Sequence, residues 1–429
     1  MPLAAQKHAY NEPGGCLACG RCGGFQILDT FNAGTVTPEV PRKGFGIAID
    51  IGTTTVVMAL LDLETGLIKA RHSFFNPQRI FAGDVISRVQ AANEGHLDKM
   101  RQLITESILK GIAGLLEFCL IKDIAEIVIA GNTAMIHLLL GFSCECLGVS
   151  PFKINRALKD RCTFGEIFHY SGSQPGNSGI NISHSLPVKI IPWFSSFIGG
   201  DVMSGLLSVM PRGLKKFLYI DLGTSGEMAL FNEGKLTAAS AAAGPAFESA
   251  CIPSAGESGG IHGRRCASGV ISGLAELVRE GIVDKSGLLS ADYSLALQKN
   301  TGEFSRRAVF SRKQIRDLQA AKSAVRSALD ILLEDSGMDF CSIDAVYLAG
   351  GIGQAINADD AAVTGLIPKE IALKCQAAGN ASLAGAARVL LSPLRANEDA
   401  ASLVRAFTEI SLAGHPRFND LFAENMLFI

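Results

Sequence analysis

Two stretches of the chain share one pattern of apolar and polar positions. AIDIGTTTVVMALLDLETG at 48–66 and YIDLGTSGEMALFNEGK at 219–235 align without a gap through their first eight residues. Each is an apolar run, a glycine turn, a second apolar run and another turn. Runs of this kind bounded by turn residues are typical of strand-turn-strand units. Because the copies begin 171 positions apart, the pattern predicts two similar α/β lobes that face each other.

A third glycine turn and a long helix are predicted later in the chain. DAVYLAGGIGQ at 344–354 is an apolar run that ends in glycines, which indicates a strand and a tight turn. Just upstream, apolar residues recur near a 3.6-residue period. Ser311 and Gln314 form a capping box and Gly337 is a stop signal, so a helix is expected between them.

Composition limits which partners and compartments fit this pattern. The 429 residues suffice for two or three domains with a sizeable core. The formal charge is −2 with both signs spread along the chain, so nucleic acid is not expected as a partner. We find neither the apolar segment of a signal peptide nor a run long enough to span a membrane, and therefore expect a cytoplasmic protein without a membrane partner.

The glycine turns carry the residue types that bind a triphosphate with magnesium. A glycine turn lets backbone N–H groups approach phosphate oxygens, hydroxyls add donors, and a carboxylate can hold the metal through its waters. The set occurs twice, as Asp50, Gly52, Thr53 and Thr54, and as Asp221, Gly223, Thr224 and Ser225. One such turn alone is typical of an ordinary hairpin. Two at matched positions of a repeat, with the glycines at 350–353 after a later strand, favour a nucleotide site.

The order DIGTTT, DLGTSGE and LAGGIG resembles the phosphate 1, phosphate 2 and adenosine motifs of the sugar kinase, Hsp70 and actin superfamily. Further segments are similar to reductive activators of corrinoid proteins, the RACo-like ATPases: FFNPQRIFAGDVISRV, AGNTAMIHLLLG, GGDVMSGLL, AAAGPAFE and GNASLAGAARVLL. The resemblance covers most of the chain from about residue 44 onward. It implies an α/β fold of two actin/Hsp70-like (ribonuclease H-like) lobes around a nucleotide cleft.

The same resemblance implies an activity and its partners. It indicates an ATPase that uses ATP and Mg²⁺ to return an inactivated Co(II) corrinoid to Co(I). The partner would be the corrinoid protein of a methyltransferase system, and the electron donor a protein such as ferredoxin. A homodimer is a further expectation.

The resemblance also assigns roles to individual residues of the three turns. These are Asp50, Gly52, Thr53 and Thr54 for phosphate 1, Asp221, Gly223, Thr224 and Ser225 for phosphate 2, and Gly350, Gly351 and Gly353 for the turn over which adenosine lies. Asp201, twenty residues before Asp221, is expected to orient the attacking water, with a helix cap as its alternative role. Glu227 is expected to hold Mg²⁺ through water. Asn132 either is structural or lines the phosphate cleft.

Three cysteines near the N-terminus, Cys16, Cys19 and Cys22, follow one another at steps of three. This spacing resembles the run that holds a [4Fe-4S] cluster, for which a fourth ligand is needed. Zinc with a further ligand such as His8, or a metal-free tail, are the alternatives. RACo-like proteins commonly begin with a ferredoxin domain and a linker domain, which we do not expect in the first 43 residues. Our hypothesis is that the thiolates are the electron port of an ATP-gated reductase.

The predicted organisation has four parts, and three other functions stay open. The parts are a cysteine-containing segment at 1–43, lobe I at 44–205, lobe II at 206–395, and a C-terminal segment at 396–429 that packs back on the body because it is too apolar to stay solvated. The alternative functions are an iron-sulfur activator of a 2-hydroxyacyl-CoA dehydratase, a small-molecule kinase with Asp201 as base, and a non-enzymatic actin-like polymer or binding clamp.

Overall fold

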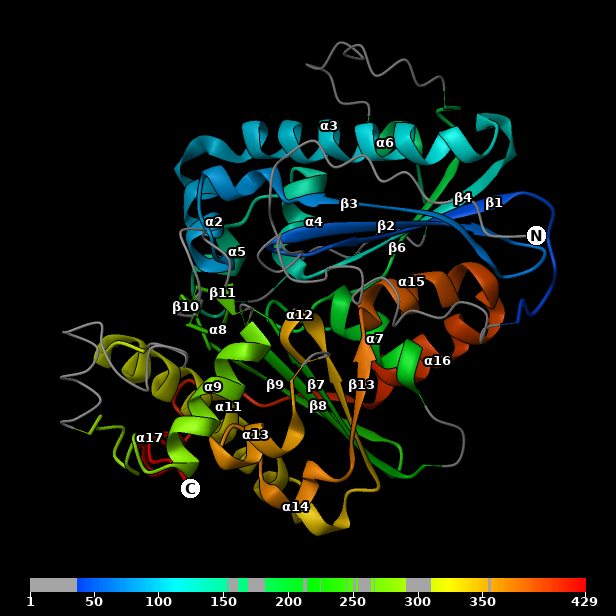
Figure 1. The fold of residues 1–429 in the computed structure, drawn as a ribbon. Coiled ribbons are helices and arrows are strands. Elements are labelled where there is room, and N and C mark those ends of the chain that lie inside the picture. Colours follow the sequence, from blue (N-terminus) through cyan, green and yellow to red (C-terminus); the bar gives the residue numbers. More distant parts are fainter. Residues whose placement is uncertain are drawn as a thin grey trace, which may run out of the picture.

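The computed structural model describes residues 37–152, 154, 161–168, 182–210, 214–223, 225–244, 246–249, 252–253, 264–265, 267–290, 310–353 and 356–429. These residues form two six-stranded sheets, with helices between the sheets and on both outer faces (Figure 1). None of the helices in these ranges has the length and apolarity needed to cross a bilayer.

The two sheets have related strand orders. The first is ordered β3-β2-β1-β4-β6-β5 and the second β13-β12-β7-β8-β9-β14. The strands of the first sheet are β1 (Phe45–Ile51), β2 (Thr55–Asp62), β3 (Ile68–Phe75), β4 (Ile124–Gly131), β5 (Cys162–Thr163) and β6 (Pro187–Ile190). Those of the second are β7 (Lys216–Leu222), β8 (Gly226–Asn232), β9 (Lys235–Ala241), β12 (Ala345–Ala349), β13 (Cys375–Gly379) and β14 (Phe407–Glu409). A short separate ribbon pairs β10 (Ile252–Pro253) with β11 (Arg264–Arg265).

The internal repeat of the sequence is confirmed as a repeat of structure. In each copy the first strand pairs antiparallel with the second, β1 with β2 and β7 with β8. In each sheet the first strand also pairs in parallel with a later strand, β1 with β4 and β7 with β12. The matched strand pairing therefore confirms the prediction of two similar α/β units.

Helices lie in three layers around these sheets. The central layer is formed by α7 (Gly200–Val209), α15 (Ala381–Leu391) and α16 (Pro393–Ala406). The helices α3 (Leu97–Leu115) and α4 (Thr133–Leu140) cover the outer side of the first sheet, and α9 (Ala267–Arg279) and α11 (Arg312–Asp335) that of the second. The shorter helices are α2 (Val85–Ala91), α5 (Glu145–Gly148), α6 (Phe164–Phe168), α8 (Ala246–Ser249), α12 (Gly350–Gly353), α13 (Ala358–Val363), α14 (Lys369–Ala372), α17 (Phe418–Asn425), and the 3₁₀ turn η2 (Pro77–Ile80).

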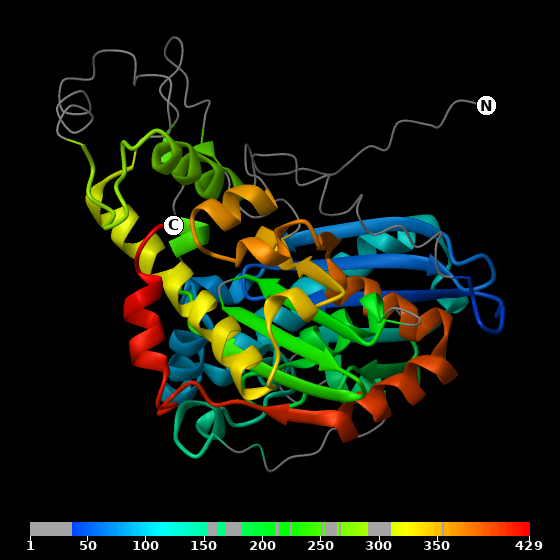
Figure 2. The same cartoon turned by 90° about the horizontal axis from the view of Figure 1, so that it is seen from below.

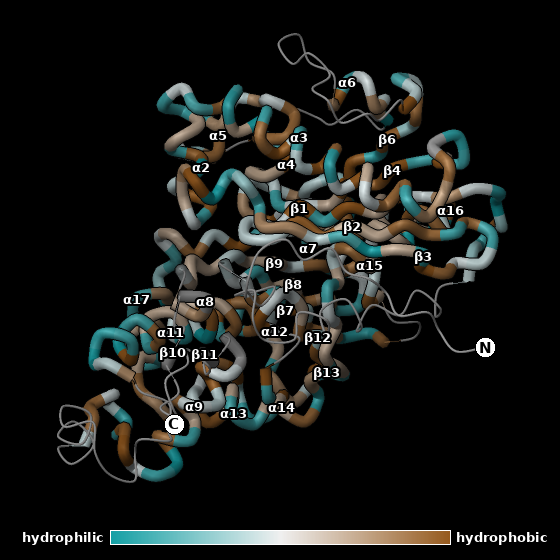
Figure 3. Tube along the Cα trace, turned by 45° about the horizontal axis from the view of Figure 1, so that its top comes forward, coloured by the Kyte–Doolittle hydropathy of each residue, from teal (hydrophilic) through white to brown (hydrophobic). Residues whose placement is uncertain are grey.

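The alternation of side chains along the strands separates the inner and outer cores. In β1, Ile47, Ile49 and Ile51 pack against the outer helices, whereas Ala48 faces the central layer. In β7, Leu218, Ile220 and Leu222 belong to the outer core of the second sheet. Successive side chains of a strand point to opposite faces, so polar residues in register with Ala48 face the space between the sheets. The apolar strands β1 and β2 lie in the interior of the molecule (Figure 3).

The central layer is packed too closely to admit extra side chains. A Cβ atom built on Gly385 of α15 would overlap the carbonyl group of Ser204 in α7. A Cβ on Gly205 would overlap the hydroxyl of Tyr219 in β7. Glycine at these positions therefore allows α7 to approach both α15 and the second sheet. The proposed boundaries between lobe I, lobe II and the C-terminal segment, at 205/206 and 395/396, fall within α7 and α16.

The long helix and the C-terminal segment form one packed unit. The capping box of Ser311 with Gln314 is present and opens α11, which confirms the predicted helix. The helix α17 packs along α11 (Figure 2). Gln319 donates from Nε2 to the carbonyl oxygen of Met426 at 2.9 Å. The C-terminal segment also contributes β14 to the second sheet, in parallel with β9.

Candidate nucleotide site

Four carboxylates converge between the two sheets. Asp50 lies near the end of β1 and Asp221 near the end of β7, each in register with the inward-facing residues of its strand. Glu227 lies at the start of β8 and pairs with Asp221 across the ladder. Asp201 is in the first turn of α7, in the central layer. Strand alternation and the start of one helix therefore bring residues from four elements to one place.

Burial disfavours the ionised form of all four groups, and neighbouring carboxylates add to this effect for Asp201, Asp221 and Glu227. The pKa of Asp201 is raised to about 7 by burial and by the nearby Asp221. Burial raises the pKa of Asp221 to about 6, against a hydrogen bond from Tyr219 that lowers it. Burial and the neighbouring aspartates raise the pKa of Glu227 well above its ordinary value. Burial also raises the pKa of Asp50, although hydrogen bonds to its side chain act in the opposite direction.

The donor set fits a hydrated magnesium ion with a phosphate ligand. Among the described residues, no basic side chain is a principal cause of these pKa shifts. A cation is therefore the group that would relieve the repulsion. The described part of the chain holds no group of three or more His, Cys, Asp or Glu placed to bind a metal directly. Magnesium suits such a site, because it usually keeps several waters and binds through one or two carboxylates and substrate phosphates.

The phosphate 1 turn is a tight hairpin held by polar side chains. Its own backbone closes through the Gly52 N–H, which donates to the carbonyl oxygen of Thr55 at 3.1 Å. Asn132 donates from Nδ2 to the Thr53 hydroxyl at 3.2 Å. Asn132 also caps α4, which is a structural role, and it lines a cavity beside the turn.

The phosphate 2 and adenosine turns lie side by side. The Gly223 N–H donates to the carbonyl oxygen of Ser225 at 3.0 Å, which closes the turn between β7 and β8. Ala349 pairs with Asp221 in the ladder, so Gly350 follows directly beside that carboxylate. Gly350 has φ of +81°, and a Cβ there would lie 2.6 Å from the carbonyl oxygen of Leu222 and overlap Asp221. Only glycine combines this backbone with this proximity.

Asp201 lies in the first turn of α7 but is not the N-cap of that helix. The N-cap residue of α7 is Gly199, whose conformation is extended. The Asp201 side chain accepts from the N–H of the next residue, Val202, at 2.9 Å. A Cβ on Gly199 would lie 2.6 Å from Asp201 Oδ1 and 2.5 Å from the Cα of Asn132. The carboxylate is thus placed between the start of α7 and the start of α4.

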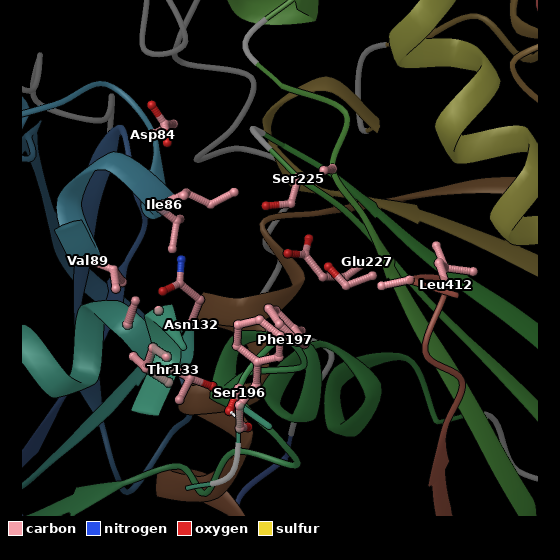
Figure 4. Close-up of a pocket in the computed structure, with 18 of the residues that line it drawn as sticks. Asp84, Ile86, Val89, Asn132, Thr133, Ser196, Phe197, Ser225, Glu227 and Leu412 are labelled. Carbon is pink, nitrogen blue, oxygen red and sulfur yellow. Dashed lines mark hydrogen bonds between the residues drawn. The ribbon is translucent and has the colours of Figure 1, made fainter. Parts of the chain in front are cut away.

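A cavity of about 1040 Å³ lies next to the phosphate 2 turn (Figure 4). It is bounded by α2 and α4 on one side and by β8, β9 and β14 on the other. Asn132 and Thr133 line one side and Ser225 and Glu227 the other. Both apolar side chains, such as Ile86 of α2, and polar ones, such as Asp84 and Glu409, line its remaining walls. Space for a bound group therefore exists beside Glu227, on the side of the turn toward β9 and β14.

Most of the predicted site residues lie close together between the two sheets. Four others lie outside the described residues: Thr224 and the cysteines Cys16, Cys19 and Cys22. Sequence reasoning missed three side chains that hold the site. Asn380 donates to Asp50 Oδ2 at 2.9 Å, Ser382 donates to Asp50 Oδ1 at 2.7 Å, and Tyr219 donates to Asp221 Oδ2 at 3.0 Å. The one signal for the first two was the segment GNASLAG, whose polar residues precede an apolar helix.

The chain matches known protein families and a solved structure over most of its length. The model of the RACo middle region matches residues 45–211, and that of the C-terminal ASKHA domain of RACo matches 215–258 and 257–429. The corrinoid activation enzyme RamQ of Eubacterium limosum is 30% identical over 91% of this chain and 71% of its own length. The [Co(II) methylated amine-specific corrinoid protein] reductase of Methanosarcina barkeri is 23% identical over 88% of this chain and 76% of its own. A solved reductive activator for a corrinoid, iron-sulfur protein superposes with a TM-score of 0.74 and 29% identity, covering 91% of this chain and 67% of the other.

Proposed function

Because the chain belongs to the RACo family, we propose that it is an ATP-dependent activator that returns the Co(II) corrinoid of a partner protein to Co(I). The observation that carries the ATP-dependent part is the buried group of four carboxylates between two matched phosphate turns. The relatives of this chain are named for activating or reducing corrinoid proteins, which favours a corrinoid partner over a dehydratase or a sugar.

The residues of the site have distinct roles in this proposal. The turns at 52–54 and 223–225 hold the phosphates, and the turn at 350–353 holds the adenosine. Asp50, Asp221 and Glu227 would hold Mg²⁺ through its water ligands. When bound, the ion supplies positive charge that stabilises the charge developing on the transferred phosphoryl group.

Asp201 is the residue we assign to the attacking water. Its pKa of about 7 allows it to be ionised in a large share of molecules near neutral pH and to accept a proton there. It lies in the first turn of α7, close enough to Asp221 and Asp50 for their charges to raise its pKa, and so among the groups proposed to hold the phosphates and the metal. In hydrolysis it orients water, and ATP and water give ADP and phosphate.

Coupling to reduction requires that the chain distinguish the two cobalt states. One electron from a ferredoxin-type donor converts Co(II) to Co(I). If one nucleotide state of the protein binds the Co(I) form about tenfold more tightly than the Co(II) form, the potential of the couple rises by about 59 mV. Closure of the two sheets on ATP is the change that would supply this difference, and hydrolysis would reverse it.

The electron port of the proposed activator is the cysteine-containing segment near the N-terminus. Cys16, Cys19 and Cys22 would hold a [4Fe-4S] cluster together with a fourth ligand. With that cluster the chain would pass the electron itself; with zinc or no metal, an external ferredoxin would deliver it. A homodimer, in which a second chain completes the ligand set, belongs to the same proposal.

The test follows cobalt reduction directly. A corrinoid-binding subunit of a methyltransferase system, loaded with Co(II) corrinoid, is mixed anaerobically with the protein and reduced ferredoxin. We expect the Co(II) EPR signal to disappear with Mg-ATP and to persist with ADP or with the Asp201→Asn variant. Reduction that is equally fast without ATP would refute the proposal. Transfer of phosphate to a sugar, in place of release as inorganic phosphate, would point to the kinase alternative.

A further inference from the structure

Of the asparagines that cap helices in the described residues, three lie beside the phosphate 1 turn. They lie in the segments FFNPQRI, AGNTAM and GNASLAG, whose residues were given no role in the proposed function. In each, the side-chain oxygen accepts a backbone N–H of the helix that follows: Asn76 from Gln78 at 3.0 Å, Asn132 from Met135 at 2.9 Å, and Asn380 from Leu383 at 2.8 Å. Asparagine is among the preferred residues at this position, so helix capping alone would account for their presence.

The second half of each side chain does something that capping does not require. The amide nitrogens all donate to the phosphate 1 turn: Asn76 to the Gly52 carbonyl oxygen at 2.9 Å, Asn132 to the Thr53 hydroxyl at 3.2 Å, and Asn380 to Asp50 Oδ2 at 2.9 Å. Because the oxygen is engaged by the helix, the orientation of each amide is fixed and its nitrogen is directed at the turn. The helices thus act as rigid supports for one short loop.

The supports come from separate parts of the fold. Asn76 follows β3 and begins η2, and Asn132 follows β4 and begins α4, on opposite sides of β1 in the first sheet. Asn380 follows β13 in the second sheet and begins α15. The turn is therefore held from both sheets, and the bond to Asp50 spans 330 positions of the chain.

Ser382 extends the support to the helix that carries Asp201. Its hydroxyl donates to Asp50 Oδ1 at 2.7 Å, so both oxygens of this carboxylate receive a hydrogen bond from the start of α15. Its carbonyl oxygen accepts from the Ser204 hydroxyl at 2.6 Å. Ser204 lies about one helical turn after Asp201 in α7.

We propose that Asn76, Asn132 and Asn380, together with Ser382, are positioning residues that fix the phosphate 1 turn in the geometry required for Mg-ATP. The inference rests on the proposed function and adds to it the residues that prepare the site. A glycine turn has many accessible conformations, and holding it in one before binding reduces the ordering cost of the ligand.

The experiment separates the donor from the cap. Asn132→Ser and Asn380→Ser keep a good capping oxygen but lose the amide nitrogen. Asn357→Ser is the matched control, because Asn357 caps α13 by accepting from Asp360 at 3.0 Å, on the outer side of the second sheet. Ser382→Ala removes a donor to Asp50 and leaves every cap intact. Mg-ATP affinity is measured by calorimetric titration of the full chain, with thermal unfolding in parallel.

We expect the three variants at the turn to bind Mg-ATP about tenfold more weakly, the effect of one lost hydrogen bond to a charged or tightly held group. Their melting temperatures should stay close to that of the control. With EDTA in place of Mg²⁺, Asn132→Ser should still weaken ATP binding, whereas Asn380→Ser and Ser382→Ala should differ little from wild type because Asp50 acts through the metal.

Two results would count against the inference and they are distinguishable. Wild-type affinity in all three variants would leave the asparagines as caps only. A wild-type chain that binds no Mg-ATP would overturn the proposed function, and the inference with it.

Discussion

The pKa of Asp201 makes a prediction about stability that can be tested without any ligand. Its pKa rises from an ordinary value of 3.8 to about 7 in the folded protein. At about 1.4 kcal/mol per pKa unit, this rise corresponds to about 4 kcal/mol of stability that depends on pH. Burial contributes most to this rise, and the nearby charge of Asp221 adds to it.

The direction follows from which state holds the proton. Below about pH 4 both the folded and the unfolded chain carry a protonated Asp201, and the group costs nothing. As pH rises from about 4 to about 7, the unfolded chain releases the proton and the folded chain keeps it, so the free energy of unfolding falls. Above about pH 7 the buried carboxylate is ionised and the full cost is present.

Asp201→Asn removes the titration and keeps an acceptor for the Val202 N–H. We therefore expect the variant to be more stable than wild type at about pH 8 by up to about 4 kcal/mol, with an advantage that shrinks to near zero at about pH 4. The assay is urea unfolding across this range, in EDTA and without nucleotide. The same variant should release phosphate from ATP about 10²- to 10⁴-fold more slowly, as expected for loss of a general base. A stability difference that does not change with pH would show that Asp201 is not buried among carboxylates as described.

Three other changes test the remaining parts of the site. Gly350→Ala forces a Cβ against Asp221 at a positive φ, so we expect loss of about 1–3 kcal/mol of stability and at least about tenfold weaker nucleotide binding, measured by urea unfolding and calorimetry. Tyr219→Phe removes the donor that lowers the pKa of Asp221, so the acidic limb of the ATPase pH profile should move to higher pH, and an unmoved limb would contradict this assignment. Cys19→Ala should abolish iron and acid-labile sulfide in anaerobically purified protein if the cysteines hold a cluster, whereas protein without iron from the start would leave electron delivery to an external donor.

Local patterns were enough to predict the turns of the site. Asp50 and Asp221 occur at equivalent points of a repeated strand-turn-strand unit, and a two-residue alternation decides which face each of them occupies. The long helix was equally predictable, because its period and its capping box are both local. In each case the interactions that define the element lie within a few residues of sequence.

Contacts between distant segments could not be read from the same patterns. GNASLAG shows a helix start but not that its polar groups meet Asp50, because that contact depends on the path of α15 between the two sheets. The raised pKa of Asp201 was hidden for a related reason, since it depends on burial and on the charges of Asp221 and Asp50, which lie far from it in sequence or in other elements. The addition of β14 to the second sheet also required the folded chain, because the strand is only three residues long.

The close packing of the central layer links the nucleotide site to the relation between the two sheets. The helices α7 and α15 begin at the site, with Asp201 in the first turn of one and Asn380 as the cap of the other. They cross where Gly385 lies against Ser204, with no room for a side chain. Well-packed contacts of this kind resist small deformations and respond by moving as units. A change in the charge held by the four carboxylates therefore acts at the ends of two helices that contact both sheets. In the proposed function, this is the route by which binding and hydrolysis of ATP at the site would alter the surface that the two sheets present to a corrinoid partner.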